Sequence, residues 1–191
     1  MSNTSATGGY LQPTQTFLEG QALLNFFHDV FVGILGFDNT LVRPFYQQNP
    51  PTRPSINVDW MAFGFGNRIV TEYPSQVQSD TEATQNASEN IEILCTFYGP
   101  NCIANAGILR DSLYITQNQE SLTLNNMALT DVANSRFFAE LVNDQYFPRC
   151  DMVINITRLI VRTYAILTLQ SAGGTIAANE AEQTITENWE T

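Results

Sequence analysis

The sequence contains no lysine, so all eight of its basic side chains are arginines. Nineteen acidic residues outnumber them, and the formal net charge is −11 at pH 7. Lysine and net positive charge supply much of the sequence-independent attraction between a protein and nucleic-acid phosphates. The composition therefore predicts a poor general binder of nucleic acids. The arginines are Arg43, Arg53, Arg68, Arg110, Arg136, Arg149, Arg158 and Arg162.

Long hydrophobic runs are absent as well. The longest apolar run, VFVGILGF at 30–37, is far shorter than the roughly 20 residues that a membrane span needs. The polar start of the chain, MSNTSATGGY, has neither the basic nor the apolar region of a signal peptide. We therefore expect a soluble protein that is made in the cytosol and contacts no membrane. With 43% apolar residues in 191, the chain is long enough for a real core.

Cysteine and histidine are scarce, with three and one residues respectively. Cys95 and Cys102 bound the segment CTFYGPNC, but zinc sites favour tight pairs such as C-x-x-C, and Cys150 is distant in sequence. A cysteine nucleophile needs a base, and nothing brings His28 to a thiol. A disulfide is disfavoured in a protein made in the cytosol. Since cysteine is often buried, the pattern favours core packing, with redox and catalytic roles as alternatives.

Recognisable phosphate-binding and metal-binding motifs are also missing. The segment FGFGN at 63–67 does not match G-x-G-x-x-G, and a P-loop needs a lysine. The aspartates are scattered along the chain, and no acidic cluster stands out as a metal site. We therefore predict no catalytic residue, no metal site and no cofactor, and interpret the protein as not being an enzyme.

Hydrophobic periodicity predicts a compact region between two polar ends. Apolar residues recur at helical spacing over 17–36, where Gly36 is the expected stop, and again over 101–115. Alternation is clearest in NIEILCTFYG at 90–99, which predicts a strand with two different faces. We therefore expect an α+β fold, a single domain whose mostly antiparallel sheet packs against two main helices. The expected boundaries are a flexible arm at 1–16, the domain at 17–176 and an acidic tail at 177–191.

The same periodicity names the residues that should face the core. In the first helix they are Leu23, Phe26, Phe27, Val30 and Ile34. In the clearest strand and the second helix they are Ile91, Ile93, Cys95 and Phe97, and Cys102, Ala106, Leu109 and Leu113. Because Gly99 and Pro100 separate these two sets, CTFYGPNC is predicted to be a strand-to-helix junction.

Less regular segments carry other predictions. The polar stretch at 73–90 is expected to be a surface loop or a mobile flap. After the second helix we expect a short polar connector, a weak strand in MALTDV, a helical turn in RFFAELVND and a long β-rich run from residue 150 to 170.

Arginines and aromatic residues without a clear buried period indicate an interaction surface. The segments at 41–54 and 58–65 mix Arg, Pro, Trp and Phe, and Arg, Tyr and Trp are enriched at binding hot spots. The alternative for these side chains is local packing. The candidate contacts with a neighbouring subunit or a partner are Tyr10, Pro13, Arg43, Arg53, Trp60, Arg110 and Trp189.

The order of several segments resembles a known family. They are GGYLQPT at 8–14, LVRPFYQQNPPTRP at 41–54, VDWMAFG at 58–64, LCTFYGPN at 94–101, LRD at 109–111, YITQN at 114–118, ELVN at 140–143 and RTYAILTLQSAGGTI at 162–176. Together they are similar to the neck terminator proteins of tailed bacteriophages, from about Gly8 to Ile176. The acidic tail lies outside the resemblance.

The resemblance implies structural work in the virion. Such proteins are ring-forming α+β subunits, typically six to a ring, at the junction between the head connector and the tail. The implied partners are further copies of the chain, a head–tail adaptor or portal-side connector, and a tail tube or sheath protein. DNA passes through the ring only as cargo, for which an acidic wall without lysine is suited.

Three other functions stay open from the sequence. A head-completion adaptor would dock on the portal with twelvefold symmetry. A small hydrolase would use Cys95 or His28. A host-directed binding protein would use the aromatic-rich surface and would be found outside the virion.

Overall fold

A computed structural model describes residues 8–15, 17–71, 73–142, 144–166, 173–180 and 183–190, the last two ranges as backbone alone. Two compact units are distinguished. The larger comprises Thr16–Pro74 and Asn86–Val161, and the other comprises Met1–Gln15, Ser75–Gln85 and Arg162–Thr191. No helix of the described part is long and apolar enough to cross a membrane.

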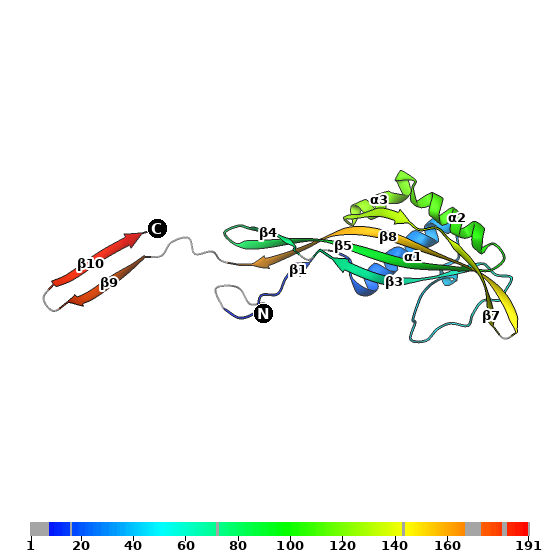
Figure 1. Ribbon diagram of the computed structural model, residues 1–191, viewed down its shortest axis with the longest axis horizontal. Coiled ribbons are helices and arrows are strands. Elements are labelled where there is room, and N and C mark those ends of the chain that lie inside the picture. Colours follow the sequence, from blue (N-terminus) through cyan, green and yellow to red (C-terminus); the bar gives the residue numbers. More distant parts are fainter. Residues whose placement is uncertain are drawn as a thin grey trace. The chain divides into compact units, whose positions relative to one another are not determined.

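The described part of the chain contains three α-helices and strands of very different lengths (Figure 1). In chain order they are β1 Thr14–Gln15, α1 Gly20–Leu35, the 3-10 turn η1 Asn39–Leu41, β2 Val42–Pro44, β3 Trp60–Val70, β4 Ser75–Gln78, β5 Glu82–Tyr98, α2 Cys102–Leu113, α3 Thr116–Leu124, β6 Met127–Val132, β7 Arg136–Val142, β8 Gln145–Ala165, β9 Gly173–Glu180 and β10 Gln183–Glu190.

Eight of the strands form one sheet with the path β1-β8-β5-β3-β2, to which β4, β6 and β7 add at β5 and β8. The short β2 runs parallel to β3, whereas β3 pairs antiparallel with β5, and β6 and β7 pair antiparallel with β8. The strands β9 and β10 form a separate antiparallel pair. The predicted α+β fold with a mostly antiparallel sheet is therefore confirmed.

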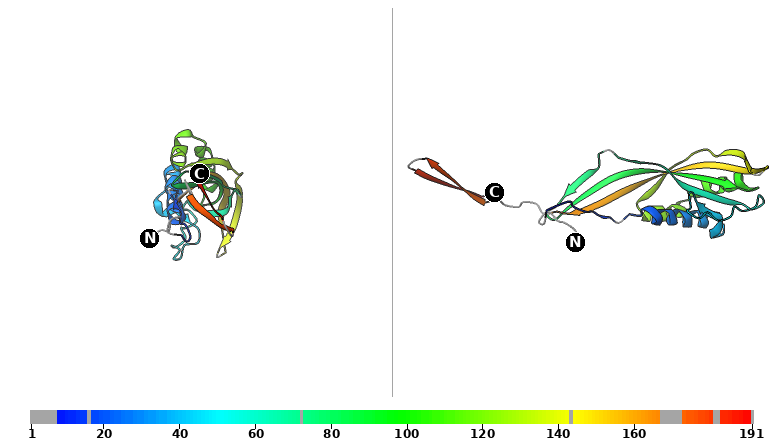
Figure 2. Two further views of the ribbon diagram at one scale, coloured as in Figure 1. Left: turned by 90° about the vertical axis from the view of Figure 1, so that its left-hand side faces the viewer. Right: turned by 90° about the horizontal axis from the view of Figure 1, so that it is seen from below.

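The helix α1 lies along one side of the strands (blue, Figure 2) and supplies the centre of the core. Leu23, Phe27 and Phe31 are spaced four residues apart and are buried, so they form one row on the helix surface. The ring of Phe31 meets that of Phe63 on β3 edge to face, with centroids 5.1 Å apart. Gly36 ends the helix with φ 66°, as the sequence predicts. Periodicity missed Phe31, which is as deeply buried as Phe27.

The segment CTFYGPNC is the predicted strand-to-helix junction. Gly99 has φ 103°, and a Cβ there would lie 2.5 Å from Asp59 Oδ1, so both backbone and space require glycine. Asp59 accepts hydrogen bonds from the backbone N–H and the side-chain amide of Asn101 at 2.9 and 2.8 Å, which holds the turn before α2. The predicted core sets on β5 and α2 are all buried. The three cysteines are free and buried, which confirms their packing role.

Three local predictions are wrong. The stretch at 73–90 is not a loop: it contains β4 and the first half of β5. In this half of β5 the buried residues are Ala83, Ala87 and the charged Glu89, which do not form a hydrophobic pattern. The segment at 136–144 is not a helical turn but contains the strand β7, whose side chains are mostly exposed on an edge.

The predicted polar connector after α2 is the helix α3. It follows α2 almost directly and has little apolar character. The side-chain amides of Asn118 and Gln119 donate to the carbonyls of Ser112 and Leu113, each at 2.8 Å. These carbonyls lie at the end of α2 and have no partner within that helix. The two hydrogen bonds therefore join α3 to α2, although α3 has no apolar stripe of its own.

A network of four charged side chains ties the start of α1 to three strands. Arg158 on β8 is fully buried and donates to Glu89 on β5 at 2.6 Å and to Glu19 at 2.7 Å. Arg68 on β3 contacts the same two carboxylates at 2.9 and 2.6 Å. Arg158 also donates to the carbonyl of Leu18. Since two cations face two anions, the charges balance inside the core.

Removing Glu89 should destabilise the fold strongly. In Glu89→Ala, the buried Arg158 loses its deepest carboxylate, and breaking a buried pair in this way costs about 3–5 kcal/mol. We expect a loss of that size in the free energy of unfolding measured with urea. The matched control is Glu82→Ala on the same strand, because Glu82 is exposed and should change stability by less than about 0.5 kcal/mol. Equal losses of unfolding free energy in the two variants would contradict a stabilising role for the network.

The network should also give the fold an acid-sensitive component. Hydrogen bonding from Arg68, joined by Arg158, lowers the pKa of Glu19 from 4.5 to about 2. Ionised Glu19 therefore stabilises the fold above about pH 4.5, and this contribution is lost as the pH falls through about 2. The difference in unfolding free energy between the wild type and Glu19→Gln should shrink over that range. A difference that stays constant down to the lower limit would count against the assignment.

Candidate functional site

The face of the sheet opposite α1 carries a groove lined by no helix residue. Residues that pair directly across two strands have their side chains on the same face of the sheet. Tyr98 pairs with Trp60, and Arg149 pairs with Phe138, so strand alternation places these side chains on the groove face. Two adjoining cavities of about 840 and 250 Å³ share Phe45, Tyr46 and Tyr98. We call them together the arginine–aromatic groove. Its charged lining residues are Arg43, Arg53, Arg136, Arg149 and Asp151.

Stacked aromatic and guanidinium groups form one end of the groove. The rings of Trp60 and Tyr98 are stacked, with centroids 4.3 Å apart and planes 11° from parallel. Arg43 lies 5.4 Å from the Trp60 ring, and Arg53 lies 4.8 Å from Tyr98 and 4.4 Å from Phe147. Contacts of this kind are attractive because the ring faces carry negative charge. Trp60 is 9% exposed, so it forms the floor of the groove rather than its rim.

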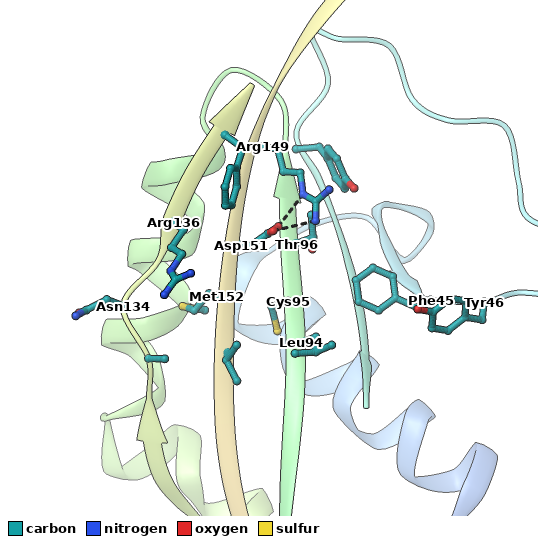
Figure 3. Close-up of a pocket in the computed structure, with 14 residues that line it drawn as sticks. Phe45, Tyr46, Leu94, Cys95, Thr96, Asn134, Arg136, Arg149, Asp151 and Met152 are labelled. Carbon is teal, nitrogen blue, oxygen red and sulfur yellow. Dashed lines mark hydrogen bonds and ion pairs between the residues drawn. The ribbon is translucent and has the colours of Figure 1, made fainter. Parts of the chain in front are cut away.

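Carboxylates neutralise part of this positive charge. Arg149 donates twice to Asp151, with both distances 2.8 Å (Figure 3). Glu140 lies 3.3 Å from Arg53 and 3.8 Å from Arg149. Hydrogen bonding to Asp151 raises the pKa of Arg149, and burial raises the pKa of Tyr98. The four arginines and two carboxylates leave a local charge of +2 in a chain whose net charge is −11.

The rim near β2 is formed by Phe45 and Tyr46 (Figure 3). A Cβ at Gly64 on β3 would lie 2.6 Å from the Phe45 ring, so glycine lets this ring rest on the strand. Tyr46 is 99% exposed and has φ 58°, which is unusual for a residue with a side chain. Backbone conformations of this kind cluster at functional sites.

The groove brings together three of the residues that the sequence suggested for an interface, Arg43, Arg53 and Trp60. Arg110 is elsewhere: it lies on α2 and pairs with its neighbour Asp111 at 2.8 Å. Tyr10 and Pro13 are exposed in the segment around β1. The side chain of Trp189 lies outside the described part of the structure. Whether any of these residues contacts a partner stays a prediction.

Sequence patterns missed Tyr98 and Arg149, which line the groove. They also missed Phe147 and Glu140, which contact its arginines. The alternation of NIEILCTFYG already placed Tyr98 on the face opposite Cys95 and Phe97. The other three lie on β7 or pair with it, and the sequence predicts a helical turn for that segment. A strand at 136–142 would have placed Glu140 opposite Phe147.

The histidine and the cysteines do not form a catalytic pair in the described structure. The ring nitrogens of His28 contact Asp29 Oδ1 at 3.0 Å and the carbonyl of Asn39 at 3.1 Å. Burial raises the pKa of Cys95 far above its usual value, which is the opposite of activation. Across the described residues, no group of three or more His, Cys, Asp or Glu side chains is placed to hold a metal ion.

The thiols should therefore be unreactive in the folded protein. All three are buried, and burial is the first cause of the raised pKa of each, so both access and thiolate are limited. Ellman's reagent should label almost no thiol in the native protein at neutral pH, and three per chain after unfolding in guanidinium. Rapid labelling of one native thiol would instead indicate an exposed, activated cysteine and would favour the hydrolase hypothesis.

Comparison with known families assigns the chain. A family model described as phage neck terminator protein matches residues 21–180, which covers most of the 191 residues. No curated protein matches the chain. The matched span includes α1 from its second residue, the whole eight-stranded sheet except β1, and every residue of the arginine–aromatic groove. The resemblance predicted from the order of sequence segments is thereby confirmed. The chain belongs to the family of phage neck terminator proteins, structural proteins of the bacteriophage virion.

Proposed function

We propose that six copies of this protein form a ring in the neck of a bacteriophage, where the ring ends the tail and joins it to the head. The observation that carries the proposal is the family match over 21–180. The proposed contacts are with neighbouring copies, with a head–tail adaptor or portal-side connector, and with a tail tube or sheath protein. The protein would be made in the host cytoplasm and would act in the virion without a cofactor.

The surface of the larger unit supports a role in assembly. A ring is built from heterologous contacts, in which one patch of each subunit meets a different patch of the next. Two patches with this character lie on the described surface. One is the arginine–aromatic groove. The other is the hairpin of β7 and β8, which exposes Phe137, Leu141 and Tyr146 by 56%, 57% and 67%. Exposed apolar side chains that gather in this way mark interaction sites.

The charge of the subunit supports DNA as passing cargo. Six copies at −11 each carry a formal charge of −66. A channel that releases DNA quickly must not hold its phosphates, and affinity for phosphates comes mainly from basic side chains. Half of the arginines lie in the groove and two more lie in the network around Glu89. We propose that acidic side chains dominate the wall of the lumen.

The particle mass in solution tests the number of subunits. Six copies of a 21.3 kDa chain give about 128 kDa, which we expect from mass photometry of the purified protein. Twelve copies, about 256 kDa, would instead support the head-completion adaptor on the portal. A ring that closes only on a tail tip would appear as single chains, so the second measurement is mass spectrometry of purified virions. A protein that is absent from those virions is not a neck component.

A further inference from the structure

The arginine–aromatic groove has positive charge that its own residues leave unmatched. Arg43 donates to the backbone carbonyls of Thr40 and Thr52 and forms no ion pair with a described carboxylate. Arg136 is exposed and makes neither a hydrogen bond nor an ion pair within the described part. Arg53 Nε is buried and has no acceptor among the described residues. Three guanidinium groups therefore lie in one groove without a full set of acceptors.

The chemistry that would fill the groove is an acidic segment with an aromatic residue. Carboxylates match guanidinium groups in bidentate geometry, and such charge-assisted bonds are about twice as strong as neutral ones. An aromatic ring would extend the stack of Trp60, Tyr98 and Arg53. Arg43 lies on β2 and Arg136 lies on β7, at opposite sides of the groove face. Positive charge is therefore present at both sides of the groove.

The chain itself carries a segment of this composition. Residues 177–191 contain four glutamates and no basic residue, and Trp189 directly precedes the last of them. Trp189 and Trp60 are the two tryptophans of the protein. The segment therefore supplies both chemical groups, carboxylate and aromatic ring. Its glutamates are Glu180, Glu182, Glu187 and Glu190.

We propose that the acidic C-terminal segment 177–191 of one copy docks in the arginine–aromatic groove of a neighbouring copy. The inference rests on the ring proposed above, because a segment that leaves one subunit and enters the next is a heterologous contact that repeats around a closed ring. In this interface, Trp60 belongs to the groove of one copy and Trp189 to the docked segment of its neighbour. It also gives the acidic subunits a specific attraction that opposes their mutual repulsion.

Photocrosslinking from the segment tests the docking in the full-length protein. With Trp189→p-benzoylphenylalanine, irradiation should produce a covalent dimer of about 43 kDa, twice 21.3 kDa. Mass spectrometry should map the joined peptides to groove residues such as Arg43, Tyr98 and Arg149. A product of single-chain mass would mean that the segment folds back on its own chain, and links to other surfaces would mean that it docks elsewhere. Either result overturns the proposal, as does the absence of a crosslink.

A matched pair of charge reversals separates groove chemistry from overall charge. Arg136→Glu changes an exposed groove residue with no described partner, so it should leave the fold intact. It should lower the yield of the dimer about fivefold, as expected when one charged contact at an interface is reversed. Arg110→Glu makes the same change on α2 and should lower the yield less than twofold. Equal losses for the two variants would show that net charge, not the groove, controls association.

The outcome for the docking is distinct from the outcome for the ring. The particle mass is measured on the same samples before irradiation. A particle of six copies without crosslinks to the groove removes the docking and leaves the proposed function in place. A chain that is absent from virions removes the proposed function, whatever the crosslinks show.

Discussion

Strict alternation along β5 and β8 is the constraint on which this structure depends. In each strand, every second side chain faces the helices, and the side chains between them lie on the opposite face. Ile93 and Phe97 are thereby buried in the core, whereas Tyr98 and Arg149 reach the groove. A shift of one residue in pairing would exchange the two sets and destroy both at once. The network around Arg158 prevents such a shift, because its ion pair to Glu89 satisfies both charges in one register only.

Arginine does the work of every basic residue here, and its placement explains why lysine is dispensable. In the network, Arg68 and Arg158 each contact two carboxylates, which a forked, planar donor does better than an ammonium. In the groove, Arg43 and Arg53 stack on rings while their N–H groups bond elsewhere. Lysine has no plane to stack. These four of the eight arginines thus hold positions that call for the shape of the guanidinium group.

The sequence predicted the fold class and most of the core because periodicity reports burial directly. The helix at Gly20–Leu35, the junction at Gly99 and the buried side of α2 all follow from apolar spacing and backbone chemistry. Prediction failed where stability comes from other sources. The first half of β5 uses small alanines and a paired glutamate, α3 uses amide side chains, and β7 is an exposed edge. None of these elements has a hydrophobic period to detect.

The candidate site was predictable only in part, for a related reason. Arg43, Arg53 and Trp60 lie close in sequence, and their composition alone marked them. Tyr98, Phe147 and Arg149 reach the groove through pairing of strands that are distant in the chain, which no local pattern contains. The charge of the site is likewise invisible in composition, since a chain at −11 gives no hint of a local +2.

Assembly of such a subunit must balance two electrostatic effects of opposite sign. Copies that each carry −11 repel one another over a Debye length of about 8 Å at physiological salt. The contacts proposed between the groove and a carboxylate would act at hydrogen-bond distance, where salt screens them less. Added salt therefore weakens the repulsion between subunits more than it weakens the proposed contacts in the groove. At higher salt concentrations the exposed Arg136 is screened as well. The proposed docking should therefore be favoured at moderate ionic strength.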